Sequence, residues 1–213
     1  MDLFITQNTY YFVHRHFIKF FENKNSEIIY VIEKKRGIKR KYLELINTFG
    51  IYKTLYLVFM ELVFMFMLYK KQKKLKAKFV YDYVLNDLLE KVIIEKKITR
   101  IISIGCPCLI DSNLQKRFGI KIFNLHGGII PFQQGRFSPI NALRNKQKFL
   151  GATIHLISDT FDNGLIISQD YFIAKNKNLI SNYNKVLSKS SQLLELFLKG
   201  INKSIPKEIL ELL

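Results

Sequence analysis

The stretch "IKIFNLHGGIIPFQQG", Ile120 to Gly135, joins an apolar run to a sudden cluster of turn residues. The apolar run predicts a buried strand over 120–124, and the glycine pair and proline that follow it are typical of a loop. Two polar side chains, Asn124 and His126, therefore lie where the predicted strand ends. Ligands of open parallel sheets bind beyond the carboxyl ends of the strands, so this strand end is a candidate site.

The rest of the chain predicts an α/β fold with a mostly parallel sheet flanked by helices. Strand, helix and strand follow one another from the N-terminus, which favours a parallel βαβ unit. No repeat or linker interrupts the pattern, so we expect a single domain over 1–213. The predicted strands cover 3–6, 27–33, 99–105, 120–124, 151–158 and 164–173, and the predicted helices cover about 8–22, 51–68, 79–96, 138–147 (with Ser138 as its N-cap) and 182–199.

Charge is the most unusual bulk property of the chain. It has 34 Lys and Arg against 17 Asp and Glu, a formal net charge of +17, while 48% hydrophobic residues indicate a substantial core. The positive excess favours a partner that carries phosphates, such as a nucleotide-linked substrate, a nucleic acid or an anionic membrane surface. A general lysine bias explains the charge equally well, because the basic residues are spread along the chain. They are densest at 33–42, expected to be a loop, and at 70–78.

The segment from Ile51 to Leu68 is long and apolar enough to raise the question of a membrane span. Lys53 and Glu61 interrupt it, and each charge near a bilayer centre costs about 2.5–3.5 kcal/mol on insertion scales. We therefore expect a buried or homodimer-forming helix, with peripheral membrane contact as the alternative.

Cys106 and Cys108 form neither a disulfide framework nor a zinc site, because they are separated by one residue and no other cysteine or nearby histidine joins them. No metal is expected. The first residues lack a secretory cleavage site, so a reducing cytoplasmic location is expected. His14 and His16 are expected to be surface residues of the first helix.

The residues at the strand ends suit attack on a carbonyl group. Asn124 can donate to a developing oxyanion, His126 can exchange a proton near neutral pH, and Asp159 or Asp162 of the turn "DTFDNG" can orient the imidazole. The chain has no Gly-x-Ser-x-Gly elbow, so the nucleophile would belong to the substrate, as an amine would. The alternative is that Asn124 and His126 have a purely structural role.

The segments "FNLHGGIIPFQQG…SPINAL" and "GATIHLISDTFDNGLIISQ" together resemble the core of the folate-dependent formyltransferases. The resemblance covers residues 98–172. It implies a Rossmann-like core in which Asn124, His126 and Asp162 are the catalytic trio. It also implies transfer of a formyl group from 10-formyltetrahydrofolate to a primary amine. Asn124 would donate to the tetrahedral oxyanion, His126 would help to stabilise it and manage protons, and Asp162 would hold His126 or a water.

The same resemblance implies that the pterin of the formyl donor contacts backbone in two places. These are Cys108, Leu109 and Ile110 after one strand, and Ser158, Asp159 and Thr160 in the loop that carries Asp162. His155 matches a strand residue of the family pattern and is expected to be structural.

Two departures from the family pattern stand out. Gly127-Gly128 replaces a pair that often ends in serine, so a contact from that hydroxyl is expected to be lost. "PFQQGRFSP" replaces the usual Tyr-Arg-Gly, a change that would alter acceptor binding.

Three acceptor amines are known for the family. The methionyl-tRNA enzymes carry a further C-terminal domain, for which residues 173–213 are expected to leave no room. The glycinamide ribonucleotide enzymes carry a glycine-rich phosphate loop after the first strand, where this chain has "TQNTYYFV". A nucleotide-linked amino sugar therefore remains as the expected acceptor, with no nucleic acid as partner. The basic, aromatic insertion at about 38–78 resembles one in formyltransferase-like proteins of surface-polysaccharide gene sets, such as those for lipopolysaccharide biosynthesis. A catalytically silent binding protein with this fold is the alternative.

Overall fold

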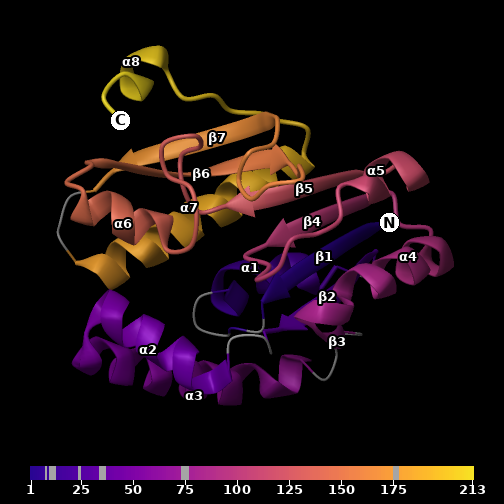
Figure 1. Cartoon of the computed structure of the whole chain (residues 1–213), viewed down its shortest axis with the longest axis horizontal. Helices are drawn as coiled ribbons and strands as arrows, with labels where there is room; N and C mark the ends of the chain where they lie inside the picture. The colour runs from indigo at the N-terminus through magenta and orange to yellow at the C-terminus, as the bar shows by residue number, and fades with distance from the viewer. Residues whose placement is uncertain (8, 10–12, 24, 34–36, 73–76, 175–177) are drawn as a thin grey trace. The chain divides into compact units, whose positions relative to one another are not determined.

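The computed structural model describes the chain except residues 8, 10–12, 24, 34–36, 73–76 and 175–177 (Figure 1). It divides into two compact units, Met1–Lys121 and Ile122–Leu213, which are described separately.

Four parallel strands form the centre of the first unit, in the order β3-β2-β1-β4. Their apolar runs are nearly continuous because helices cover a parallel sheet on both faces. Leu3, Ile5 and Tyr30 are fully buried there. The strands are β1 (Asp2–Gln7), β2 (Ser26–Ile32), β3 (Ala77–Tyr81) and β4 (Arg100–Ile104).

Helices α1 (Arg15–Phe21) and α4 (Leu85–Lys96) bury one apolar side each, and α4 does so through Leu85, Leu89, Val92 and Ile93 at helical spacing. The short helices are η2 (Asp82–Val84) and α5 (Asn113–Phe118). The predicted helix over 79–96 is wrong at its start, because 77–81 pairs with Ile28–Ile32 as strand β3. The surface position predicted for His14 is also wrong. Its ring is fully buried and stacks on Tyr30 with 4.9 Å between ring centroids.

Helices α2 (Gly37–Phe49) and α3 (Ile51–Gln72) follow β2 and pack against each other. Gly50, with φ +83°, allows the chain to turn between them. The loop predicted over 33–42 is therefore helical from Gly37 onward, in a stretch rich in good helix formers. The sequence predicts a buried or homodimer-forming helix over 51–68. Burial is wrong for most of α3, since Tyr52 and Phe66 are 86% and 84% exposed, and homodimer formation stays a prediction. Among the described residues, none of the helices is long and apolar enough to span a membrane. Part of the basic run 70–78 lies outside the described residues.

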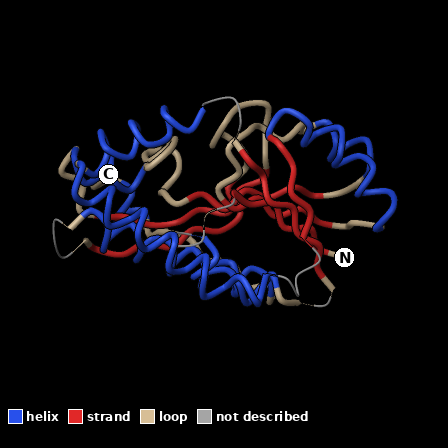
Figure 2. The backbone as a smooth tube through the Cα atoms, turned by 90° about the horizontal axis from the view of Figure 1, so that it is seen from below, coloured by secondary structure: helices blue, strands red, loops and turns tan. Residues whose placement is uncertain are grey.

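The second unit consists of antiparallel strands with helices packed on them. Figure 2 shows the strands of the chain in red and its helices in blue. Its core includes Ala142, Leu150, Phe172 and Val186. Ser138 is the first residue of α6 rather than its N-cap, and Phe137 takes the cap position with φ +52°. The elements are β5 (Lys121–His126), α6 (Ser138–Arg144), β6 (Phe149–Leu156), β7 (Ile166–Ile173), α7 (Leu179–Leu198) and α8 (Lys207–Leu210). The predicted α/β fold is confirmed, with its parallel strands in the first unit.

Candidate active site

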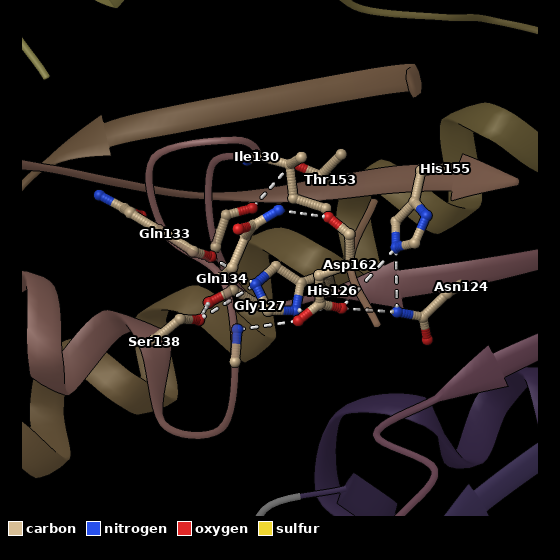
Figure 3. A network of polar contacts seen from close by, with 12 residues as sticks. Asn124, His126, Gly127, Ile130, Gln133, Gln134, Ser138, Thr153, His155 and Asp162 are labelled. Atoms are coloured by element: carbon tan, nitrogen blue, oxygen red, sulfur yellow. Dashed lines mark hydrogen bonds and ion pairs between the residues drawn. The ribbon is translucent and has the colours of Figure 1, made fainter. Parts of the chain in front are cut away.

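The end of β5 brings the predicted trio together inside the second unit (Figure 3). Asn124 and His126 are two residues apart on β5, so their side chains leave the same face of the strand. The antiparallel register places His155 of β6 directly opposite Asn124. Asp162 comes from the turn between β6 and β7, and its carboxylate lies against all three side chains.

Asp162 is held in place through its backbone and its side chain. Its φ of +53° is left-handed, a conformation that aspartate tolerates better than most residues. The Gln134 amide donates to its carbonyl at 2.7 Å, and the Gly135 N–H donates to Oδ2 at 2.8 Å. Gly164, which leads into β7, has no room for a Cβ because the carbonyl of Leu156 already lies there. The second carboxylate oxygen, Oδ1, is left to face His126.

The hydrogen bonds of His126 show which of its atoms carry protons. Nε2 lies 2.6 Å from the carbonyl oxygen of Gln133, which can only accept, so Nε2 must donate. The Ser138 hydroxyl donates to the Gly127 carbonyl at 2.9 Å and offers its oxygen to the same Nε2 at 3.2 Å. Nδ1 lies 3.3 Å from Asp162 Oδ1, where two acceptors would repel each other unless a proton sits between them. Nδ1 and Oδ1 are therefore placed so that a proton can pass between them.

Asn124 is oriented by His155. The Nδ1 of His155 lies 2.8 Å from the Leu156 carbonyl and donates to it, so its Nε2 accepts from Asn124 Nδ2 at 3.1 Å. Burial lowers the pKa of His155, which keeps the imidazole neutral and able to accept. The other amide N–H of Asn124 points to Asp162 Oδ1 at 3.4 Å, near the limit for a hydrogen bond. That weakly held N–H is the one available to a substrate oxygen.

Sequence reasoning missed Gln133, which holds the loop around His126. Its buried side-chain amide donates to the Phe149 carbonyl at 2.7 Å, and its oxygen accepts from the Ile129 N–H at 3.1 Å. Thr153 adds a second anchor by donating to the Gly128 carbonyl at 2.7 Å. A polar residue inside the apolar run "GGIIPFQQG" is the only signal that pointed to Gln133.

Gly128 and Ser138 explain one departure from the family pattern, the glycine at position 128 where a serine is common. A Cβ at position 128 would lie 2.7 Å from Ser138 Oγ and 2.8 Å from His126 Nε2, and it would also collide with the carbonyl of Gln133. Glycine is therefore required here. A hydroxyl group still lies beside His126, but it comes from α6.

The residues predicted to contact the formyl donor fall in both units. Cys108, Leu109 and Ile110 follow β4 in the first unit, where Asn86 donates to the Leu109 carbonyl at 3.3 Å. A hydrogen bond with Cys108, together with burial, raises the pKa of Cys106, so that thiol stays protonated. Ser158, Asp159 and Thr160 follow β6 in the second unit, where the Ser158 hydroxyl donates to the Thr160 carbonyl at 3.0 Å. The described part of the chain contains no group of three His, Cys, Asp or Glu residues that could hold a metal ion.

Comparison with known proteins identifies relatives of this arrangement. A family model described as "Formyl transferase" matches residues 65–197, more than half of the chain. The mitochondrial formyltetrahydrofolate deformylase 2 of Arabidopsis thaliana is 34% identical over 61 residues, which is 29% of this chain and 19% of that protein. The chain thus matches only about a fifth of the length of this relative.

Solved structures share the fold at low sequence identity. The phosphoribosylglycinamide formyltransferase of Campylobacter jejuni is 18% identical with a TM-score of 0.61, covering 94% of this chain and 96% of that one. A sugar N-formyltransferase from a Shewanella species is 17% identical with a TM-score of 0.58, covering 97% and 73%. With the family model spanning the strand ends described above, the chain belongs to the formyl transferase family.

Proposed function

We propose that the chain is an N-formyltransferase, acting as one catalytic domain over 1–213, which moves a formyl group from 10-formyltetrahydrofolate to a primary amine. The observation that carries the proposal is the position of Asp162 Oδ1, 3.3 Å from His126 Nδ1 and 3.4 Å from the Asn124 amide nitrogen. These groups supply an oxyanion donor and a proton carrier, and they include no nucleophile of their own. Such a site serves a reaction in which the substrate amine attacks.

In this mechanism the amine nitrogen bonds to the formyl carbon while the carbonyl electrons move onto oxygen. Asn124 donates the N–H that now points weakly to Asp162 at 3.4 Å, and the oxyanion forms there. The attacking nitrogen loses a proton to Asp162, directly or through a water. The oxyanion electrons then re-form the carbonyl, the bond from carbon to N10 of the folate breaks, and N10 takes the proton that Asp162 had received. His126 stabilises the carboxylate throughout through Nδ1, because Nε2 is committed to Gln133.

The proposed acceptor is a nucleotide-linked amino sugar. A net charge of +17 suits a substrate that carries a diphosphate, and the stretch after β1 lacks the glycines of a phosphate loop. Two of the structural neighbours are a sugar N-formyltransferase and a 4-N formyltransferase, and others are glycinamide ribonucleotide transformylases.

Hydrolysis is the second candidate, because two relatives, 34% and 31% identical over 61 residues, are named formyltetrahydrofolate deformylases. Water would then take the place of the amine, and formate would be released. The oxyanion donor and the proton carrier would serve either reaction.

The test is to mix purified protein with 10-formyltetrahydrofolate and a panel of amines, and to follow the absorbance of released tetrahydrofolate. The panel contains nucleotide-linked amino sugars, glycinamide ribonucleotide and methionyl-tRNA. We expect turnover with one or more nucleotide sugars. Turnover without any amine would favour hydrolysis, and the absence of both turnover and folate binding would leave a catalytically silent fold.

A further inference from the structure

The outward face of α3 is an apolar surface that the catalytic site does not use. Tyr52, Phe59 and Phe66 are 86%, 61% and 84% exposed. The same helix also exposes Leu55, Tyr56, Leu62 and Met67. We call this set the α3 face. Thr54 and Leu57 are buried on the opposite side of α3, so the helix is docked on its own unit and leaves the α3 face to solvent.

The α3 face follows the helix rather than being scattered over it. Residues 52, 55, 59, 62 and 66 are spaced by three and four, which places them on one side of an α-helix. Single exposed apolar residues are ordinary, but a contiguous apolar stripe of this length marks an interaction site. Tyrosines and phenylalanines dominate it, and such rings favour the boundary between water and lipid.

The charge that adjoins the α3 face in the sequence favours an anionic occupant. Residues 37–78 contain ten Lys and Arg against two acidic residues, Glu44 and Glu61. Six of the ten lysines and arginines stand between Lys70 and Lys78, directly after the apolar stripe in sequence. An apolar helix next to a polybasic run combines the two weak signals that together hold a protein on a membrane surface.

We propose that the α3 face docks on an anionic lipid surface, with α3 lying in the plane of the headgroups. A second copy of the chain is the less favoured occupant, because each copy would bring a net charge of +17 to the contact. An interfacial helix also agrees with Lys53 and Glu61, which stay near water when α3 lies flat. The proposal concerns a surface of the first unit and does not depend on the proposed reaction.

The experiment is sedimentation of the full chain with vesicles of phosphatidylcholine alone and of phosphatidylcholine mixed with phosphatidylglycerol. The double substitution Phe59→Ser and Phe66→Ser removes two rings of the α3 face. The matched control is Ile94→Ser, which removes one apolar side chain that is 65% exposed on α4. Circular dichroism of each variant verifies that the fold is kept, and light scattering records the oligomeric state.

We expect the wild type and Ile94→Ser to sediment with the anionic vesicles and to be released by salt. The double variant should bind at least about tenfold more weakly, because it lacks two rings whose apolar surface the lipid would bury. Equal binding by the double variant, or no binding to anionic vesicles by the wild type, would overturn the proposal. So would a wild-type dimer that the double variant converts to a monomer, which would assign the α3 face to a second copy.

Discussion

Replacing Asp162 by asparagine removes the charge of the proposed proton carrier while keeping its shape. Asparagine tolerates the left-handed backbone of this position, where φ is +53°. Its amide oxygen can still accept from the Gly135 N–H, which lies 2.8 Å from Oδ2. Its NH₂ group can donate to His126 Nδ1, at the position where Oδ1 now lies 3.3 Å away. The variant should therefore fold, but it has no carboxylate at position 162 to receive a proton.

The structure separates the expected effect on rate from the effect on stability. Two hydrogen bonds to a carboxylate become bonds to an amide, and the Asn124 N–H that donates to Oδ1 at 3.4 Å then faces a second donor. Together these changes lower the free energy of unfolding by about 1–3 kcal/mol. Loss of the proton carrier lowers kcat by roughly 10²–10⁴-fold, equivalent to about 3–5 kcal/mol of barrier. Turnover should thus fall at temperatures where the variant is still fully folded.

The assay is release of tetrahydrofolate under single-turnover conditions, with thermal unfolding measured on the same samples. Nitrogen-15 NMR of His126 adds a readout independent of activity, because the proton at Nδ1 should be absent in Asp162→Asn. The matched control is Asp87→Asn, the same chemical change at an exposed position in the first turn of α4. A folded Asp162→Asn protein whose kcat is within tenfold of the wild type would refute the role given to this carboxylate.

Three further predictions concern His14, Ser138 and Gly128. Burial lowers the pKa of His14 to about 4, so the unfolded chain takes up this proton first as the pH falls below 6.5. About 3 kcal/mol of stability should be lost between pH 6.5 and 4, and urea unfolding should show a smaller loss for His14→Phe. Ser138→Ala should lower kcat by less than tenfold, because Gln133 still holds His126 Nε2 at 2.6 Å, and a larger loss in the same assay would contradict this. Gly128→Ala should lower kcat, and it should lower the free energy of unfolding by about 1–3 kcal/mol, because the added Cβ collides with its neighbours. Unchanged thermal unfolding would contradict this and show that the loop shifts at little cost.

The sequence predicted the trio because each member belongs to a short pattern with strong local meaning. Asn124 and His126 end an apolar run, and Asp162 lies in a turn rich in Asp and Gly. The pairing of β5 with β6 is less visible, since antiparallel register depends on contacts between distant segments. For that reason the sequence could not show that His155 orients Asn124.

Other features escaped prediction because local composition does not decide burial. Apolar periodicity indicates a helix over 51–68 but does not say whether its apolar face meets the core or solvent. Ser138 before Pro139 is a good N-cap pattern, yet the hydroxyl bonds the Gly127 carbonyl instead. The sequence around 79–81 predicts the start of a helix. The structure has strand β3 there instead, because these residues pair with β2, a distant contact that local sequence does not show.

The fate of a labelled formyl carbon tests the central claim most directly. The protein is mixed with 10-formyltetrahydrofolate carrying carbon-13 in the formyl group and with the amine found active in the panel, and the products are separated by mass. The account predicts that the label appears in an amide of that amine with wild-type protein and is nearly absent from the products of Asp162→Asn and Asn124→Ala. Label recovered only as formate, or on the amine in equal amounts from all three proteins, would contradict it.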